Sequence, residues 1–257
     1  MNLINPRTGR PIARRRDPEK LQPPPTWGED ELTRYLDNAR HNQWATFVNK
    51  RPQIRKLIAI DAEFAKVTEG WTNPDREIPA QLFLRCMASF RAAAGHAMAG
   101  QVREVFVVSR AQLEDAGLAI HLHHDQSLEE VWLRRNDSAA AEKKQRDACA
   151  IHLVIKAVKA ANRHAGARFE KLYKEAIDFG AHPNQRAVTA NLKMEREPNQ
   201  ITMKAIMQHG DGVQLDYALM FVARCGVVCL ETLETAFKAK FTLLGISQAI
   251  LELRRGL

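Results

Sequence analysis

The sequence lacks most of the motifs that identify an enzyme family or a membrane protein. It contains no Walker phosphate loop, no glycine-rich dinucleotide turn, no GxSxG elbow and no HExxH motif. No apolar run approaches the length of a membrane span, and no apolar segment follows the N-terminal arginines as it would in a secretory signal. We therefore expect a cytoplasmic protein with no membrane partner and no cofactor.

Cysteine is also scarce, with four residues among 257. All four lie in apolar stretches that are predicted to be helical, where cysteine usually behaves as a small buried hydrophobic residue. The closest pair, Cys225 and Cys229, has a spacing that is poor for a zinc knuckle. The cysteines therefore predict no metal site, and they are consistent with a reducing cytoplasm.

Positive charge is in excess, with a formal net charge of +8. Residues 1–26 hold six basic and two acidic residues among six prolines, so a net +4, half of the excess, lies there. This composition predicts a disordered or extended tail, followed by a single helical domain at residues 27–257. The tail is a candidate contact for nucleic-acid phosphates, although such termini are more often simply solvated.

Apolar residues spaced three and four apart predict helices through most of the domain. Gly100 is expected to separate two antiparallel helices, and Ser127 with Glu130 fits a capping box. The pattern changes only at residues 190–207, where apolar and polar residues alternate around a Pro–Asn turn and predict a β-hairpin. The predicted fold class is an all-α helical bundle with one small hairpin. The expected helices are residues 31–48, 52–67, 79–98, 101–123, 128–135, 138–162, 166–180, 214–236 and 238–254.

The helix expected at residues 101–123 carries a charged pair, Arg110 and Glu114. At 100° per residue the two lie about 40° apart within an apolar arc, whereas Gln112 and Asp115 lie on the far side. This placement predicts a buried ion pair, and removing one member of such a pair costs about 3–5 kcal/mol. The pair is either a structural contact that sets the register of packed helices or a polar site between helices.

Three further side chains are candidate members of that site. Arg224 and Glu231 share a face of the helix at 214–236, so they form either a second embedded pair or, with the first, one buried network. His121 lies on the same line as Glu114 and titrates near neutral pH, which fits a binding role. We predict no metal there, because the helix dipole alone favours histidine at this helix end and no second helix offers a Glu-x-x-His partner.

A loop supplies the second candidate site. Gly180 is typical of a residue that follows a helix end, and Pro183 keeps His182 out of the helical conformation. Asn184 is expected to cap the next segment. Loops on a rigid scaffold often carry catalytic groups, and a solvated histidine after a helix stop is the equally supported alternative.

Two of these segments together resemble a known family. The run from Gly100 to Glu114 has the form G-x-x-x-E-x5-R-x-x-L-E, and Trp-Leu-Arg-Arg follows at residues 132–135. With the Gly-Ala-His-Pro-Asn loop at residues 180–184, it resembles a family of uncharacterised bacterial all-helical proteins over about residues 80–190. The resemblance implies a helical fold and a distant relation to HEPN domains, but no particular activity.

Arg146 and His152 loosely resemble the Arg and His motif of HEPN ribonucleases, small helical nucleases that cut RNA at a dimer interface. On one helix the two would point about 120° apart, which argues against joint action within one subunit. The resemblance implies a metal-independent ribonuclease that uses Arg146 and His152, or Arg110 and His182.

Three hypotheses therefore stay open. The favoured one is a structural or interaction protein built around the Arg/Glu network, with a homodimer as its expected assembly. The second is the HEPN-like ribonuclease. The third is a bundle that binds a small molecule near Glu114 and His121, with metal binding at these residues as its less favoured version.

Overall fold

The protein is described by a computed structural model that covers residues 23–69, 71, 72 and 74–257. These residues are mainly helical with one two-stranded antiparallel hairpin, which confirms the predicted fold class. The chain divides into two compact units between residues 38 and 39. Most of the predicted basic tail, residues 1–22, lies outside the described residues, so its contact with nucleic acid stays a prediction.

The described part of the first unit, residues 23–38, contains the start of α1 (Glu31–Asn49). Asp30 precedes this helix, and its carboxylate accepts hydrogen bonds from the amide and hydroxyl of Thr33, at 2.9 and 2.7 Å. The hydroxyl bond first, and then the amide bond, lowers the pKa of Asp30. A side chain that accepts from an amide of the first turn caps a helix, so α1 begins where the local sequence predicts.

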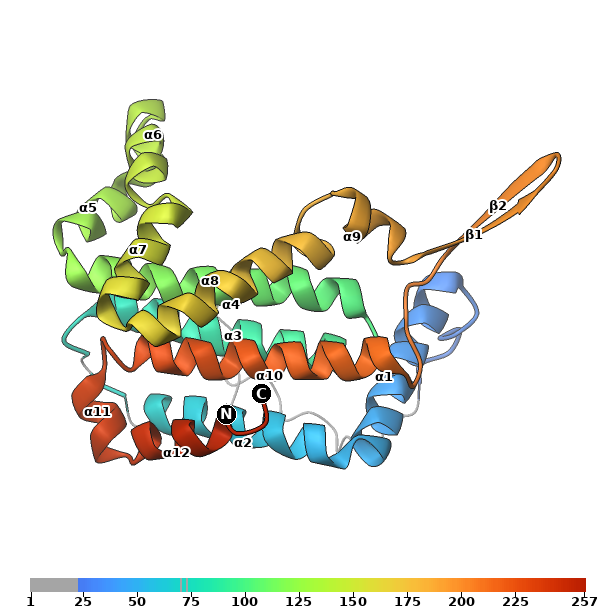
Figure 1. Ribbon diagram of the computed structural model, residues 1–257, viewed down its shortest axis with the longest axis horizontal. Coiled ribbons are helices and arrows are strands. Elements are labelled where there is room, and N and C mark those ends of the chain that lie inside the picture. Colours follow the sequence, from blue (N-terminus) through green and yellow to red (C-terminus); the bar gives the residue numbers. More distant parts are fainter. Residues whose placement is uncertain (1–22, 70, 73) are drawn as a thin grey trace. The chain divides into compact units, whose positions relative to one another are not determined.

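Four long helices form the core of the second unit: α2 (Arg51–Thr68), α3 (Glu77–Met98), α4 (Val102–His124) and α10 (Val213–Leu233). They run alongside one another in Figure 1, and α10 contacts the other three. Gly100 joins α3 to α4 with a φ of +75°, and a Cβ there would lie 2.1 Å from the His209 carbonyl oxygen. The predicted break at Gly100 is confirmed, because only glycine fits this turn.

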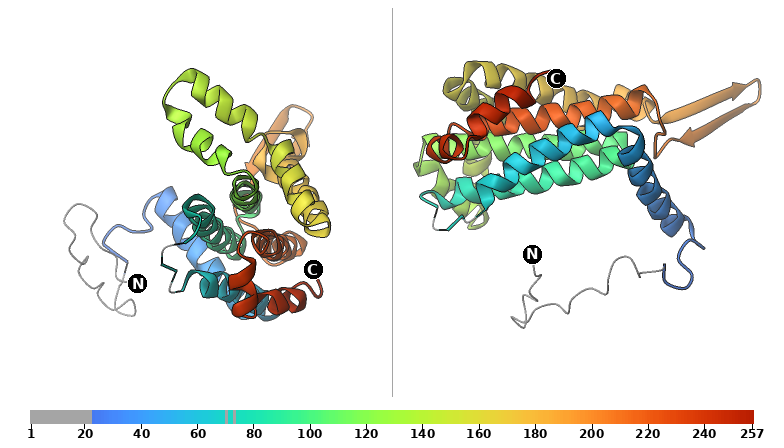
Figure 2. Two further views of the ribbon diagram at one scale, coloured as in Figure 1. Left: turned by 90° about the vertical axis from the view of Figure 1, so that its left-hand side faces the viewer. Right: turned by 90° about the horizontal axis from the view of Figure 1, so that it is seen from below.

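Shorter helices surround this core. Both α7 and α8 contact α4, whereas α5 and α6 project from the bundle, as Figure 2 shows. These elements are α5 (Ser127–Leu133), the 3₁₀ turn η2 (Arg134–Asn136), α6 (Ala139–Ala148), α7 (Ile151–Ala161), α8 (Arg163–Ala176), the π-turn η3 (Ile177–Ala181), α9 (Gln185–Thr189), α11 (Lys238–Leu243) and α12 (Ile246–Leu253).

Two predicted helices are each broken into two. The segment 138–162 forms α6 and α7, because Ala150 is extended with a φ of −60° and a ψ of 139°. The segment 238–254 forms α11 and α12, because Gly245 adopts the left-handed conformation with a φ of 71°. Both breaks fall within continuous apolar spacing, so periodicity alone did not predict them.

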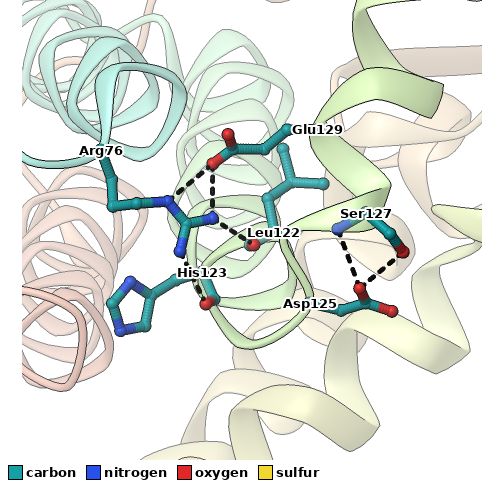
Figure 3. Close-up of polar contacts among 6 residues, drawn as sticks. All are labelled: Arg76, Leu122, His123, Asp125, Ser127 and Glu129. Carbon is teal, nitrogen blue, oxygen red and sulfur yellow. Dashed lines mark hydrogen bonds and ion pairs between the residues drawn. The ribbon is translucent and has the colours of Figure 1, made fainter.

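Two helix starts also differ from prediction. Asn162 accepts a hydrogen bond from the Ala165 amide at 3.0 Å, so α8 begins before the expected residue 166. The predicted capping box at Ser127 is wrong, because Ser127 is already the first residue of α5. Its amide and hydroxyl instead donate to one carboxylate oxygen of Asp125, at 3.0 and 2.7 Å (Figure 3).

Helix α10 is long and apolar enough to cross a membrane by length and composition, contrary to the expectation that no apolar run reaches that length. It is the one such helix among the described residues. Of its most apolar window, 67% is buried within the protein, where α10 contacts α2, α3 and α4. A helix that is apolar on most of its surface is expected to be buried in this way.

The predicted hairpin at residues 190–207 is confirmed. Strands β1 (Leu192–Glu197) and β2 (Gln200–Ala205) pair antiparallel, with Met194 opposite Met203 and Glu195 opposite Thr202. Among the residues that the structure describes, the strands pair with no third strand, and their tip extends away from the helices of the second unit (Figures 1 and 2).

Candidate functional site

The predicted ion pair on α4 exists, but it is not buried. The Nε of Arg110 lies 2.9 Å from Oε1 of Glu114, and the two side chains are 32% and 43% exposed. The opposite side of the helix is the buried one, since Gln112 is fully buried and Asp115 only 8% exposed. The angular pattern pointed to the wrong side, because the polar side of α4 is covered by neighbouring helices and Asp115 there accepts a hydrogen bond from Arg85 of α3 at 3.2 Å.

A tyrosine from α8 completes this cluster. The hydroxyl of Tyr173 donates to Oε1 of Glu114 at 2.9 Å, and the Nε of Arg110 donates to the same hydroxyl at 3.2 Å. The guanidinium carbon of Arg110 lies 5.5 Å from the centre of the Tyr173 ring, a distance typical of a cation–π contact. Burial, and then the Glu114 carboxylate, raises the pKa of Tyr173.

Arg110 also ties the predicted loop to α4. Its Nη1 donates to the carbonyl of Ala181 at 3.3 Å, directly before His182. Gly180 has a φ of 179°, so it is not the left-handed helix stop that the sequence suggested. A Cβ at Gly180 would lie 2.8 Å from the Arg103 carbonyl oxygen, so the close approach of the π-turn η3 to α4 requires glycine.

The loop residues lie as predicted. His182 is extended, with φ and ψ of −139° and 143°, and its side chain is exposed. Asn184 caps α9 by accepting a hydrogen bond from the Ala187 amide at 2.9 Å. The side-chain amide of Asn184 also donates to the Ile177 carbonyl at 2.9 Å, which holds the loop against the end of α8. The structure therefore places Arg110, Glu114, Tyr173 and the His182 loop in one open cluster.

The other predicted residues lie apart from this cluster. His121 contacts the Ala148 carbonyl through Nε2 at 2.9 Å, which joins α4 to the end of α6. Arg146 on α6 and His152 on α7 are both exposed, and the break at Ala150 separates them. The angle calculated for a single continuous helix therefore does not apply to them. Within the described part of the chain, no group of three metal-binding side chains occurs.

The predicted network of Arg110, Glu114, Arg224 and Glu231 is wrong. Arg224 instead pairs with Glu175 of α8, with nitrogen–oxygen distances of 3.2 and 3.4 Å. Burial, and then the hydrogen bond to Glu175, raises the pKa of the neighbouring Tyr217 to about 12.

Glu231 has two other partners. Its carboxylate oxygens contact Arg168 at 2.5 Å and Arg254 at 3.4 Å. Sequence reasoning missed Arg168, Glu175 and Arg254. Arg168, Leu172 and Glu175 have the i, i+4, i+7 spacing of one helix face, and this signal marks α8 as a partner of α10.

The hairpin presents a different kind of candidate surface. In the observed register, one face of the hairpin carries a single charged residue, Arg196, which lies near the turn. The apolar side chains in the middle of this face are exposed, by 46% for Met194, 57% for Ile201 and 67% for Met203. The opposite face is charged. There Glu195 contacts Lys193 at 3.0 Å and Lys204 at 3.8 Å. We define the apolar hairpin face as Leu192, Met194, Ile201, Met203 and Ala205.

No protein-family model, curated protein or solved structure matches this chain. The fold and these surfaces define an all-helical bundle protein with an amphipathic hairpin arm.

Proposed function

We propose that the protein is a helical interaction protein that forms a homodimer by packing its apolar hairpin face against that of a second copy. The observation that carries this proposal is the exposure of Met194, Ile201 and Met203 on one face of an isolated hairpin. We do not base the interaction role on the Arg/Glu network expected from the sequence, because the Arg110 and Glu114 side chains are partly exposed and form no buried network.

The stability of the hairpin supports an external partner. A lone two-stranded hairpin is at best marginally stable in water, and it gains stability when its apolar face is covered. Among the described elements, the main contacts of β1 are with its partner strand and α9. Contiguous exposed apolar side chains of this kind mark interaction surfaces.

Self-association suits this face better than a charged partner does. In a two-fold dimer the same patch meets itself, and the paired residues Met194 and Met203 lie near the middle of the strands. Methionine side chains are flexible enough to fill such an interface. On the charged face, Lys193 and Lys204 balance Glu195 and Glu197, so that face carries no net charge.

Sedimentation velocity of the full chain over a wide concentration range tests the proposal. We expect a dimer whose dissociation constant rises at least tenfold in Met203→Asp, since tenfold corresponds to about 1.4 kcal/mol and an unpaired buried charge costs more. Thr202→Asp is the matched control, because Thr202 is adjacent in β2 but lies on the charged face. A monomeric wild type, or equal effects of the two variants, would overturn the proposal.

A second candidate function is the metal-independent ribonuclease, and one contact favours it. The hydrogen bond from Arg110 to the Ala181 carbonyl holds the exposed His182 loop beside a charged cluster, where an arginine and a histidine could act on a phosphodiester. The test is RNA cleavage by purified protein in the presence of a chelator. We expect His182→Ala to lose cleavage and His152→Ala to keep it. If the wild type cleaves no RNA over a range of pH, this candidate function is wrong.

A further inference from the structure

A pocket of about 210 Å³ lies between α8, α10 and the residues that follow α12. Its polar lining consists of four cationic side chains: Arg168 and Lys171 from α8, Arg224 from α10, and Arg254. These come from three separate segments of the chain, so tertiary structure alone brings them together. Neither the hairpin nor the Arg110 cluster contributes to this pocket.

Two carboxylates accompany the four cations. Glu231 accepts from both Arg168 and Arg254, and its side chain is 6% exposed. Glu175 accepts from Arg224, and its side chain is 12% exposed. Over these six side chains, four positive and two negative charges leave an excess of two positive charges. The buried carboxylates hold the three guanidinium groups in place, because a planar guanidinium has donors for more than one acceptor.

Two hydrogen-bond donors of this pocket are unused within the part of the chain that the structure describes. Lys171 is exposed and has no acidic partner. The Nε of Arg168 is buried without a hydrogen-bond acceptor. A buried donor left unpaired costs about 1–3 kcal/mol, so a shift of the Arg168 guanidinium that brings this N–H to an acceptor on a ligand would be stabilising.

The other side chains of the lining are apolar, and they include Leu257, which is 37% exposed. Leu172, Val227 and Val228 contribute to it, and each is at most 3% exposed as a residue. A pocket with cationic and apolar sides suits a compact ligand that has both an anionic and an apolar part.

We infer that this pocket binds a small organic phosphate monoester. A phosphate monoester carries nearly two negative charges at neutral pH, which matches the local excess of two positive charges. Its oxygens accept hydrogen bonds from arginine in the geometry that guanidinium groups favour. The organic part of the ligand lies against Leu172 and Val227. This assignment is independent of the hairpin and of dimerisation.

Isothermal titration calorimetry of the full chain with phenyl phosphate tests the inference. We expect saturable binding with one site per chain, tighter than that of inorganic phosphate and of benzoate. Inorganic phosphate lacks the apolar part, and benzoate carries one charge instead of two. Binding should weaken below pH 6, near the second pKa of a phosphate monoester, which is about 6.

Lys171→Gln and Lys174→Gln form a matched pair of variants on α8. Lys171 lines the pocket, whereas Lys174 pairs with Glu170 and does not line it. We expect Lys171→Gln to weaken phenyl phosphate binding roughly fivefold, which corresponds to about 1 kcal/mol, and Lys174→Gln to leave it unchanged. Arg254→Gln should weaken it as well.

Three results would overturn the assignment: no binding of phenyl phosphate at millimolar concentration, equal weakening by Lys171→Gln and Lys174→Gln, or equal affinity for phenyl phosphate and inorganic phosphate. Both lysine side chains are exposed, so both variants are expected to fold. Circular dichroism of each variant checks this before titration.

Discussion

The guanidinium of Arg76 donates two hydrogen bonds to one carboxylate oxygen of Glu129, from Nε at 3.1 Å and from Nη2 at 2.6 Å. The same group donates to the backbone carbonyls of Leu122 and His123, at 3.0 and 3.2 Å (Figure 3). The last carbonyls of a helix have no partner within it, so Arg76 closes the C-terminal end of α4. It thereby joins the segment before α3 to α4 and α5.

We predict that Arg76→Met lowers the free energy of unfolding by about 2–4 kcal/mol, because it leaves two carbonyls and a partly buried carboxylate without their donor. Glu129→Gln keeps one acceptor oxygen and should cost about 1 kcal/mol. Arg134→Met is the control, since Arg134 and its partner Glu130 are 67% and 70% exposed, and exposed pairs contribute little. Urea unfolding followed by circular dichroism measures all three variants. Equal losses of unfolding free energy in Arg76→Met and Arg134→Met would contradict this account.

Gly117 allows α4 to approach α7 and α8 closely. A Cβ at this position would lie 2.6 Å from Cγ1 of Val154 and 2.8 Å from Cζ of Phe169. We expect Gly117→Ala to destabilise the protein by about 1–3 kcal/mol, as overpacked cores do. Gly95→Ala in α3 should instead stabilise it by about 0.5–1 kcal/mol, because the nearest contact there is 3.7 Å and alanine favours the helix. Thermal unfolding compares the two variants with the wild type. If both substitutions moved the melting temperature in the same direction, the prediction would be wrong.

The carboxyl of Asp115 should make stability depend on pH. Burial raises its pKa above the ordinary value of 3.8, although Arg85 lies 3.2 Å away and opposes the shift. The folded protein therefore binds this proton more tightly than the unfolded chain does. The stabilisation is present at low pH and is lost as the pH rises through the folded pKa.

Asp115→Asn removes that charge. We expect the variant to be about 1 kcal/mol more stable than the wild type at pH 7, because one buried carboxylate oxygen of Asp115 has no partner. The difference should vanish as the pH falls toward 4. Chemical unfolding of both proteins at a series of pH values checks this. If the difference in free energy of unfolding grew toward low pH, the folded pKa of Asp115 would be lowered instead of raised.

Glu114→Gln tests how much the pair on α4 contributes to stability. Because its side chain is 43% exposed, the loss should be below about 1 kcal/mol rather than the larger value of a buried pair. Tyr173→Phe should cost about 0.5–1.5 kcal/mol through its lost hydroxyl. A double-mutant cycle of the two by urea unfolding gives their coupling. A loss of more than about 3 kcal/mol of unfolding free energy for Glu114→Gln would instead support the structural role that the sequence predicted for the pair.

Local sequence was a good guide where a feature depends on neighbours within a few positions. The alternation at residues 190–207 predicted the hairpin, because the two strands are joined by a tight turn. Asn184 was recognised as a cap because a cap bonds to an amide three residues away. The contact of Arg110 with Glu114 followed from the same kind of reasoning, since side chains four apart on a helix are neighbours.

The sequence by itself therefore determined the helical class of this protein, the hairpin and the pairing of Arg110 with Glu114. Only the tertiary structure decided that the pair faces outward, that Glu231 binds Arg168 and Arg254, and that four cations surround one pocket. Helical spacing shows which residues share a face. It does not show which face a neighbouring helix covers, because that depends on contacts between segments distant in the chain.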